Sequence, residues 1–363
     1  MLISILVCAF LTLCKVAFDI IGQLTLSRRL GFLESAHDVD GMLNELNIEF
    51  DYRGTVQNMP WLDRVLRKNP LYLYFKTPTS FFAAHSRRLA AERMQDEKHE
   101  GVDMLDGFLD ARKKHPDIVD EVTMFGLIST NFLAGSDTTS VSLRSIIYNL
   151  LKNPNALKKL QGELDANVTV YPPDYTTAAN LKYLDAVIHE ALRVHPIGSI
   201  VFERVVPSLG HTTSVSGTEL PPGTQIAQTP WTMNFDEQIW GPEPRKFKPE
   251  RWLRYENESE EEFEKRHALM KHNDFSFSYG PRACLGRHIA WMEMVTVVPT
   301  LFGLLDVSGL PLVVSDHDAN SYQIQLADPQ KEWEVHGAFF TRQHDMDVTM
   351  KWRDGVDEAR ILD

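Results

Sequence analysis

The sequence predicts a mainly α-helical fold with small β-sheets, and three observations carry this prediction. Apolar residues recur three and four apart over most of residues 16–195, which is the period of an amphipathic helix. Over residues 197–252, β-branched residues, glycines and prolines replace that pattern and indicate short strands and turns. No internal repeat or flexible linker divides the 363 residues. We therefore expect one α-rich domain.

The first fourteen residues form an apolar leader that ends before Lys15. This run is shorter than the roughly 20 residues that span a bilayer, and it lacks the basic start of a secretory signal. Three interpretations remain: a marginal membrane anchor, a buried helix, or a wrongly assigned first exon. We assign residues 1–14 to the leader and residues 15–363 to the domain.

Several amphipathic helices should follow, separated by turn and proline signals. These segments are 17–33, 38–50, 80–94 and 103–115. The run 117–151 keeps the helical period for longer than an ordinary globular helix, and its middle is almost uncharged. Such a helix must cross the centre of the domain. Two more helices are expected, one from Pro154 and one over 181–195, where Pro196 stops it.

The second half of the chain alternates between irregular and regular segments. Short strands and a proline-rich meander are expected over 197–252, and helical pattern resumes after Cys284. The acid-rich segment 256–266 should be a solvated surface segment, because clustered like charges repel. Strand-like stretches at 321–327 and 345–352 close the chain.

Composition and charge exclude some classes of function. The chain is 43% hydrophobic and 24% charged, as globular proteins are. Its 37 Lys and Arg residues against 50 Asp and Glu residues give a formal net charge of −13, which argues against a nucleic-acid partner. An odd set of cysteines, Cys8, Cys14 and Cys284, suits a reducing compartment.

The stretch "FSYGPRACLGRHIA", residues 277–290, places Cys284 between two glycines and before an apolar helical pattern. Glycines around a sulfur let main-chain N–H groups turn towards it. A following helix N-terminus also favours a thiolate. A free cysteine is most often an inert core residue, but a thiolate in this setting would suit iron as a ligand. A nucleophile with His288 as its base is less favoured, because no third orienting group accompanies the pair. Zinc is disfavoured, because no second cysteine is near.

Five positions of this stretch carry a family resemblance. Phe277, Gly280, Arg282, Cys284 and Gly286 reproduce the pattern F-x-x-G-x-R-x-C-x-G, which resembles the heme-binding loop of the cytochrome P-450 superfamily. The resemblance implies heme b as cofactor, with Cys284 as the axial ligand of the heme iron. Such a thiolate favours O–O cleavage. Arg282 is implied to contact a heme propionate.

The middle of the long helix contains the cluster "AGSDTT" at 134–139. Ser, Asp and Thr side chains compete for backbone hydrogen bonds, and Gly weakens a helix. The cluster is therefore unusual inside a helix, and one explanation is that it forms a kink. The cluster is also similar to the family's oxygen-activation motif. That similarity implies that Ala134 and Gly135 flank the oxygen site and that Asp137 and Thr138 serve oxygen activation and proton delivery.

Three further charged residues resemble a structural network of the family. Glu190 and Arg193 are three apart on a helix and share a face. With Arg251 in "FKPERW" they are similar to the family's E-x-x-R motif and its third member, which implies a buried network. Arg204 falls where family members place a second propionate-binding arginine.

The resemblance runs from about Val16 to the C-terminus. The segments 31–33, 59–70 and 331–343 are similar to fungal members of the pisatin demethylase branch. Before residue 17 we find no match to the N-terminal third of full-length members. The resemblance implies a heme-thiolate monooxygenase that inserts one oxygen atom from O2 into a small apolar organic substrate, as a tailoring step of fungal secondary metabolism. Electrons would come from NADPH through a flavoprotein reductase, on the cytosolic face of the endoplasmic reticulum membrane. The alternative is an inactive remnant or a mis-predicted fragment of such an enzyme.

Overall fold

Helices dominate the structure, as the sequence predicts. The computed structural model describes residues 7–35, 37–57, 59–75, 81–96, 99, 102–198, 203–208, 213–306, 325–326, 334–337, 340–344, 347–349 and 351–353. The α-helices are α1 (Ala9–Leu26), α2 (Phe32–Ser35), α3 (Met42–Val56), α4 (Pro60–Leu66), α5 (Pro70–Phe75), α6 (Phe81–Met94), α7 (Met104–Lys114), α8 (Glu121–Lys152), α9 (Pro154–Asn167), α10 (Tyr175–Ala179), α11 (Lys182–Val194), α12 (Pro230–Met233), α13 (Glu237–Trp240), α14 (Glu260–His272) and α15 (Arg287–Leu304). Short 3-10 helices are η1 (Val39–Gly41), η2 (Pro249–Trp252) and η3 (Gly280–Arg282).

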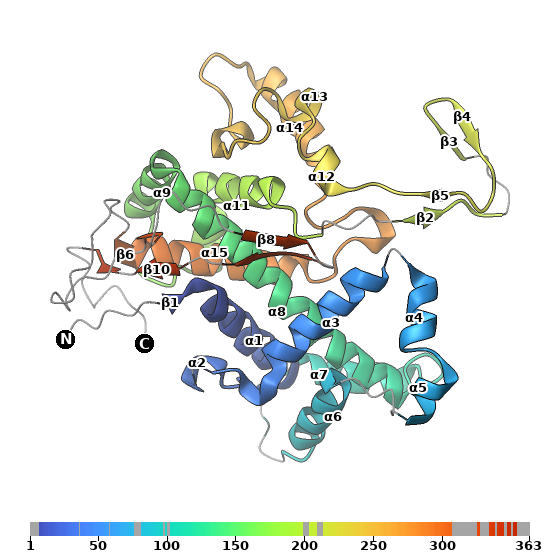
Figure 1. The fold of residues 1–363 in the computed structure, drawn as a ribbon. Helices are drawn as coiled ribbons and strands as arrows, with labels where there is room; N and C mark the ends of the chain where they lie inside the picture. Colours follow the sequence, from blue (N-terminus) through green and yellow to red (C-terminus); the bar gives the residue numbers. More distant parts are fainter. Residues whose placement is uncertain are drawn as a thin grey trace.

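The strands are short and pair antiparallel, which confirms the expectation of small sheets. They are β1 (Val7–Cys8), β2 (Arg204–Val205), β3 (Thr213–Val215), β4 (Thr218–Leu220), β5 (Gln225–Ile226), β6 (Leu305–Asp306), β7 (Gln325–Leu326), β8 (Glu334–Gly337), β9 (Thr341–His344), β10 (Asp347–Thr349) and β11 (Lys351–Trp352). The sheet orders are β1-β10-β7, β11-β6, β2-β5, β3-β4 and β8-β9. Figure 1 shows the β3–β4 hairpin projecting away from the helices, beyond β2 and β5.

The long helix α8 crosses the centre of the molecule, with α1 beside it (Figure 1). Asp120 caps its start by accepting a hydrogen bond from the Thr123 N–H at 2.7 Å. The helix then continues for 32 residues through the polar cluster at 134–139. The prediction of a central helix over 117–151 is confirmed to within a few residues.

Two apolar clusters lie at opposite ends of α8. Its N-terminal half contributes Met124, Ile128 and Phe132 to a cluster with side chains of α1, α3, α6 and α7. Its C-terminal half contributes Leu143 and Ile146, among others, to a larger cluster with side chains of α9, α11 and α15. The polar cluster of α8 therefore lies between the two apolar cores.

The β8–β9 hairpin closes against the C-terminal half of α8. The Gln343 side-chain amide donates to the Val141 carbonyl at 3.2 Å. Thr341 donates from its backbone N–H to the Ile197 carbonyl at 3.1 Å and from its hydroxyl to the Pro196 carbonyl at 2.7 Å. The segment after α11 is thereby held beside α8.

The leader predicted over residues 1–14 continues into the first helix. Residues 1–6 lie outside the described residues, and α1 begins at Ala9 and runs across the proposed boundary at residue 14. Leu13 and Cys14 are buried, while the assignment of residues 1–14 to a leader stays a prediction. Within the described part of the chain, no helix combines the length and apolar character needed to cross a membrane.

The acid-rich segment 256–266 lies at the surface, as predicted, and its second part forms the first turns of α14. Ser259 and Glu262 form a reciprocal capping box that starts α14. Glu258 pairs with Arg266 on the same helix at 2.7 Å, and Met270 is buried against Trp240 and Trp252. The segment is thus exposed, while α14 is fixed by its cap at the start and by Met270 near its end.

Candidate functional site

The loop around Cys284 is closed by one backbone hydrogen bond. The Cys284 N–H donates to the Phe277 carbonyl at 2.8 Å. Gly280 has φ +70°, a conformation that favours glycine, and η3 continues to Arg282. Phe277 packs on the larger apolar cluster. The hydrogen bond joins the two ends of the loop, and Cys284 is the residue at its second end.

The sulfur of Cys284 is exposed and lies just before the first turn of α15. A Cβ atom on Gly286 would lie 3.9 Å from it. Within the described ranges, Sγ of Cys284 makes no hydrogen bond. The main-chain N–H donors expected around a thiolate are therefore not seen at this sulfur among these residues. His288, the alternative base, is exposed and forms no hydrogen bond with Cys284 there either. Among described residues, the group spaced for a metal ion is His99, Asp103 and Asp106, which does not include Cys284.

The polar cluster of α8 does not interrupt the helix. Asp137 is buried, and the Thr138 hydroxyl donates to the Ala134 carbonyl one turn back at 2.6 Å. Ser136 bonds back to Phe132 in the same way at 2.5 Å. Such back-bonding lets hydroxyl residues remain in a helix. Ala134 is exposed, on a face of α8 not covered by either apolar cluster.

Gly135 has a packing role that the sequence analysis missed. A Cβ atom at this position would lie 2.9 Å from Ile21 Cδ1 and 3.0 Å from its Cγ1. The glycine therefore permits α1 to approach α8 closely. Its assignment to an oxygen site stays a prediction.

Arg204 lies beside residues 275–284, which we call the cysteine loop. It occupies β2, is exposed, and lines a hollow of about 670 Å³ together with Phe275, Ser278 and Tyr279 from the start of that loop. The other walls are mainly apolar side chains from β3 to α12, such as Leu220 and Ile226. Arg282 is also exposed. Two arginines thus flank the loop that carries the thiol.

Glu190 and Arg193 form a fully buried, two-point ion pair. The Arg193 guanidinium donates to both carboxylate oxygens of Glu190, from Nη2 at 2.7 Å and from Nε at 2.9 Å. Both side chains have an exposed fraction of 0%. The third guanidinium nitrogen donates to the carbonyls of Asn234 and Pro244, each at 2.6 Å. This geometry satisfies a buried charge almost completely.

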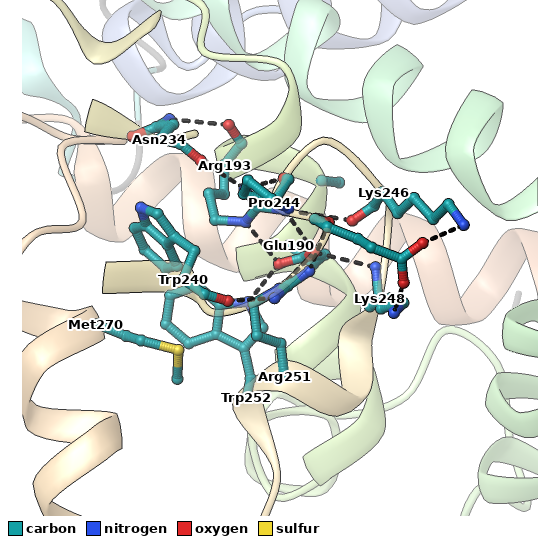
Figure 2. Close-up of polar contacts among 12 residues, drawn as sticks. Glu190, Arg193, Asn234, Trp240, Pro244, Lys246, Lys248, Arg251, Trp252 and Met270 are labelled. Atoms are coloured by element: carbon teal, nitrogen blue, oxygen red, sulfur yellow. Dashed lines mark hydrogen bonds and ion pairs between the residues drawn. The ribbon is translucent and has the colours of Figure 1, made fainter. Parts of the chain in front are cut away.

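Arg251 joins the same carboxylate, as Figure 2 shows. Its Nε lies 3.3 Å from Glu190 Oε1, and its other nitrogens donate to the carbonyls of Trp240, Pro242 and Glu243. The structure therefore brings the three charged residues together and uses them to hold the irregular chain between α12 and η2 against α11.

Two members of this network were missed by sequence reasoning. The Trp252 indole N–H donates to Glu190 Oε2 at 3.0 Å, and the Lys248 backbone N–H donates to Oε1 at 3.0 Å. Trp252 directly follows Arg251, so its position was a usable signal. Lys248 contributes only its backbone, which leaves no trace in residue identity.

Glu293 is a buried acid on α15, nine residues after Cys284. Its side chain is 6% exposed, and its Oε2 has no hydrogen-bond partner among described residues. Burial raises the pKa of this carboxyl to about 8. The sequence analysis did not single it out.

The structure combines a mainly helical domain, a cysteine loop before one helix, a polar cluster in the long central helix and a buried Glu–Arg–Arg network. This combination is the one expected of a heme-thiolate protein. The cytochrome P450 family profile matches residues 9–332. The chain therefore belongs to the cytochrome P450 family, which implies heme as cofactor and a redox partner.

Several curated relatives of the chain are fungal proteins. The chain is 38% identical over 353 residues to the cytochrome P450 monooxygenase cfoH of Aspergillus candidus, covering 96% of this chain and 62% of that protein. It is 34% identical over 352 residues to the cytochrome P450 monooxygenase vrtE of Penicillium aethiopicum, covering 93% and 64%. A third relative, cicH of Emericella nidulans, is 33% identical over 359 residues, covering 96% and 67%. The chain thus spans less than two thirds of the first two relatives.

The residues around Cys284 fit a heme. A thiolate sulfur is a soft ligand suited to iron, and this sulfur is exposed at the end of a closed loop. Arg282 and Arg204 are exposed near the same loop, and guanidinium groups match carboxylates such as propionates.

Proposed function

We propose that this chain carries the heme-thiolate centre of a monooxygenase that inserts one oxygen atom from O2 into a small apolar organic substrate. By similarity to the fungal relatives, the reaction is a tailoring step of secondary metabolism. The observation that carries the proposal is Cys284, presented at the end of a closed loop before α15, within a chain that matches the family over residues 9–332.

The chain's residues have separate tasks in this proposal. Heme b, when bound, supplies the oxygen-activating chemistry. Cys284 Sγ binds the iron as a thiolate, and Arg282 and Arg204 bind the propionates. Ala134 and Gly135 border the oxygen side. Asp137 would serve proton delivery and Thr138 would donate a hydrogen bond to the bound oxygen, while Glu190, Arg193 and Arg251 keep the protein around the loop in place.

Electron supply and location complete the proposal. An NADPH-dependent flavoprotein reductase is the proposed partner, and it docks near Cys284, where Arg282 and Arg287 are exposed and can meet acidic groups. The proposed location is the cytosolic face of the endoplasmic reticulum membrane. Segments 31–33, 59–70 and 331–343 support assignment to the pisatin demethylase branch.

The test is the carbon monoxide difference spectrum of the reduced chain expressed with added heme. The proposal expects the strongly red-shifted Soret band of thiolate-ligated iron, and expects Cys284→Ala to lose it. Cys14→Ala is the matched control, because this buried cysteine contacts Ser140 instead, and it should keep the band. A folded chain with no such band would support the inactive remnant or mis-predicted fragment.

A further inference from the structure

His189, next to Glu190 on α11, lies between Trp252 of the Glu190 network and the start of the cysteine loop. Its Nδ1 lies 3.2 Å from Asp274 Oδ2, and both side chains are mostly buried, with exposed fractions of 20% and 15%. The imidazole stacks on Trp252, with ring centroids 4.6 Å apart and planes at 23°. Trp291 packs on it at 4.7 Å. The ring is therefore fixed by two indoles and one carboxylate.

Asp274 stands at the base of the cysteine loop and uses both oxygens. Oδ1 accepts hydrogen bonds from the Ser276 N–H at 3.0 Å and from the Ser276 hydroxyl at 2.5 Å, while Oδ2 faces His189. Burial favours the neutral acid, but the hydrogen bonds from His189 and Ser276 outweigh it and hold the pKa of Asp274 below its usual value. The carboxylate is thus an ionised link between α11 and the loop.

The same histidine also reaches the far side of the loop. Trp291 belongs to α15, the helix that follows Cys284, and it meets Phe277 edge to face with ring centroids 6.5 Å apart. Phe277 is the residue whose carbonyl accepts the Cys284 N–H. His189 therefore contacts the chain before the loop through Asp274 and the chain after it through Trp291.

We propose that His189 and Asp274 are positioning residues, and that the His189–Asp274 pair ties the cysteine loop 275–284 to α11 and so fixes where Cys284 is presented. Tyr279 also meets His272 edge to face, with ring centroids 5.8 Å apart. No other ion pair within the described ranges joins this loop or its base to a helix, and Tyr279, Gly280 and Arg282 are exposed. The consequence for heme ligation rests on the proposed function. The consequence for the order of the loop does not.

The first test measures the loop in the heme-free chain by peptide-resolved amide hydrogen exchange and by the rate of Cys284 alkylation. The variants are His189→Phe, which keeps a flat ring between the two indoles, and Asp274→Asn. The control is Asp185→Asn, which removes the other carboxylate near His189, at 3.9 Å from Nε2, but has no contact to the loop.

The proposal expects exchange in residues 275–286 to rise by about tenfold in His189→Phe and Cys284 to react faster, while α9 and the core of α8 keep their protection. Asp185→Asn should match the parent chain. Equal exchange in His189→Phe and Asp185→Asn, or an increase spread evenly over the helices, would overturn the proposal. Should Asp274→Asn fail to fold, His189→Phe decides the test.

The second test loads the variants with heme and records the fraction of bound heme that shows the thiolate-type carbon monoxide band. His189→Phe should lower that fraction while total bound heme stays close to that of the parent. An unchanged fraction would refute the effect on Cys284. If the parent chain itself shows no such band, the proposed function fails, and the exchange experiment still decides whether the pair orders the loop.

Discussion

At the scale of single residues, Cys284 owes its place to the backbone around it rather than to contacts of its own sulfur. Its N–H is bonded to Phe277, and the positive φ of Gly280 turns the chain. The side chain is left free to bind a partner from outside the protein. Glu293, nine residues later, shows the opposite situation, because its carboxyl is enclosed and has no donor among the described residues.

Glu293 should make stability fall as pH rises. Its folded-state pKa of about 8 lies above the usual value of 4.5, so between these pH values the folded chain holds a proton that the unfolded chain releases. Stability then declines by up to about 1.4 kcal/mol per pH unit across this window. Glu293→Gln should remove this slope in urea unfolding at pH 5–8, whereas exposed Glu264→Gln should not. Identical slopes for parent and Glu293→Gln would show that the acid is ionised in the fold.

At the scale of elements, the contact between α1 and α8 depends on the absence of a side chain at Gly135. Gly135→Ala places a Cβ 2.9 Å from Ile21 Cδ1, closer than Cβ atoms come to a neighbouring atom, and overpacking of this kind costs about 1–3 kcal/mol. We expect a lower unfolding free energy in urea titration. The added cost should be relieved when Ile21→Ala is combined with it, as a double-mutant cycle reports. Additive effects would mean that α1 shifts without strain.

The Glu190 network ties α11 to η2 and the chain before it. Glu190→Gln leaves Arg193 and Arg251 buried without their carboxylate, and such a loss costs about 3–5 kcal/mol. Glu92→Gln is the matched control, because Glu92 also faces two arginines, Arg28 and Arg88, but at the surface; its cost should stay below about 1 kcal/mol. Denaturant unfolding measures both. Similar losses in the two variants would contradict the distinction between buried and exposed pairs.

At the scale of the whole molecule, heme binding and folding should be linked. A ligand that binds only the folded chain stabilises it by about 2.7 kcal/mol at one hundred times its dissociation constant. Adding heme to the purified chain should therefore raise the thermal midpoint in circular dichroism, and Cys284→Ala should reduce the rise. An unchanged thermal midpoint after heme addition would contradict heme binding by this chain.

From the residues alone, the sequence predicted features whose partners lie close along the chain; Arg251, 61 positions from Glu190, entered the predicted network only through the family resemblance. The pairing of Glu190 with Arg193 follows from their spacing on one helix. The carbonyls of Asn234 and Pro244 that surround Arg193 have no residue signature, because any residue supplies a carbonyl. His189 and Asp274 are 85 positions apart, so no local pattern joins them. The capping box of Ser259 and Glu262 was visible as S-x-x-E, but the surrounding acids obscured it.

The position of α8 also affects how the chain is made. The ribosome releases α1 before α8, yet the buried face of α1, including Phe18 and Ile21, packs with side chains of α8. The 94 residues between Leu26 and Glu121 take roughly 5–20 s to synthesise. During that interval the apolar face of α1 waits without its partner helix. Until α8 is made, the part of this face that α8 covers is open to chaperones that bind exposed apolar surface.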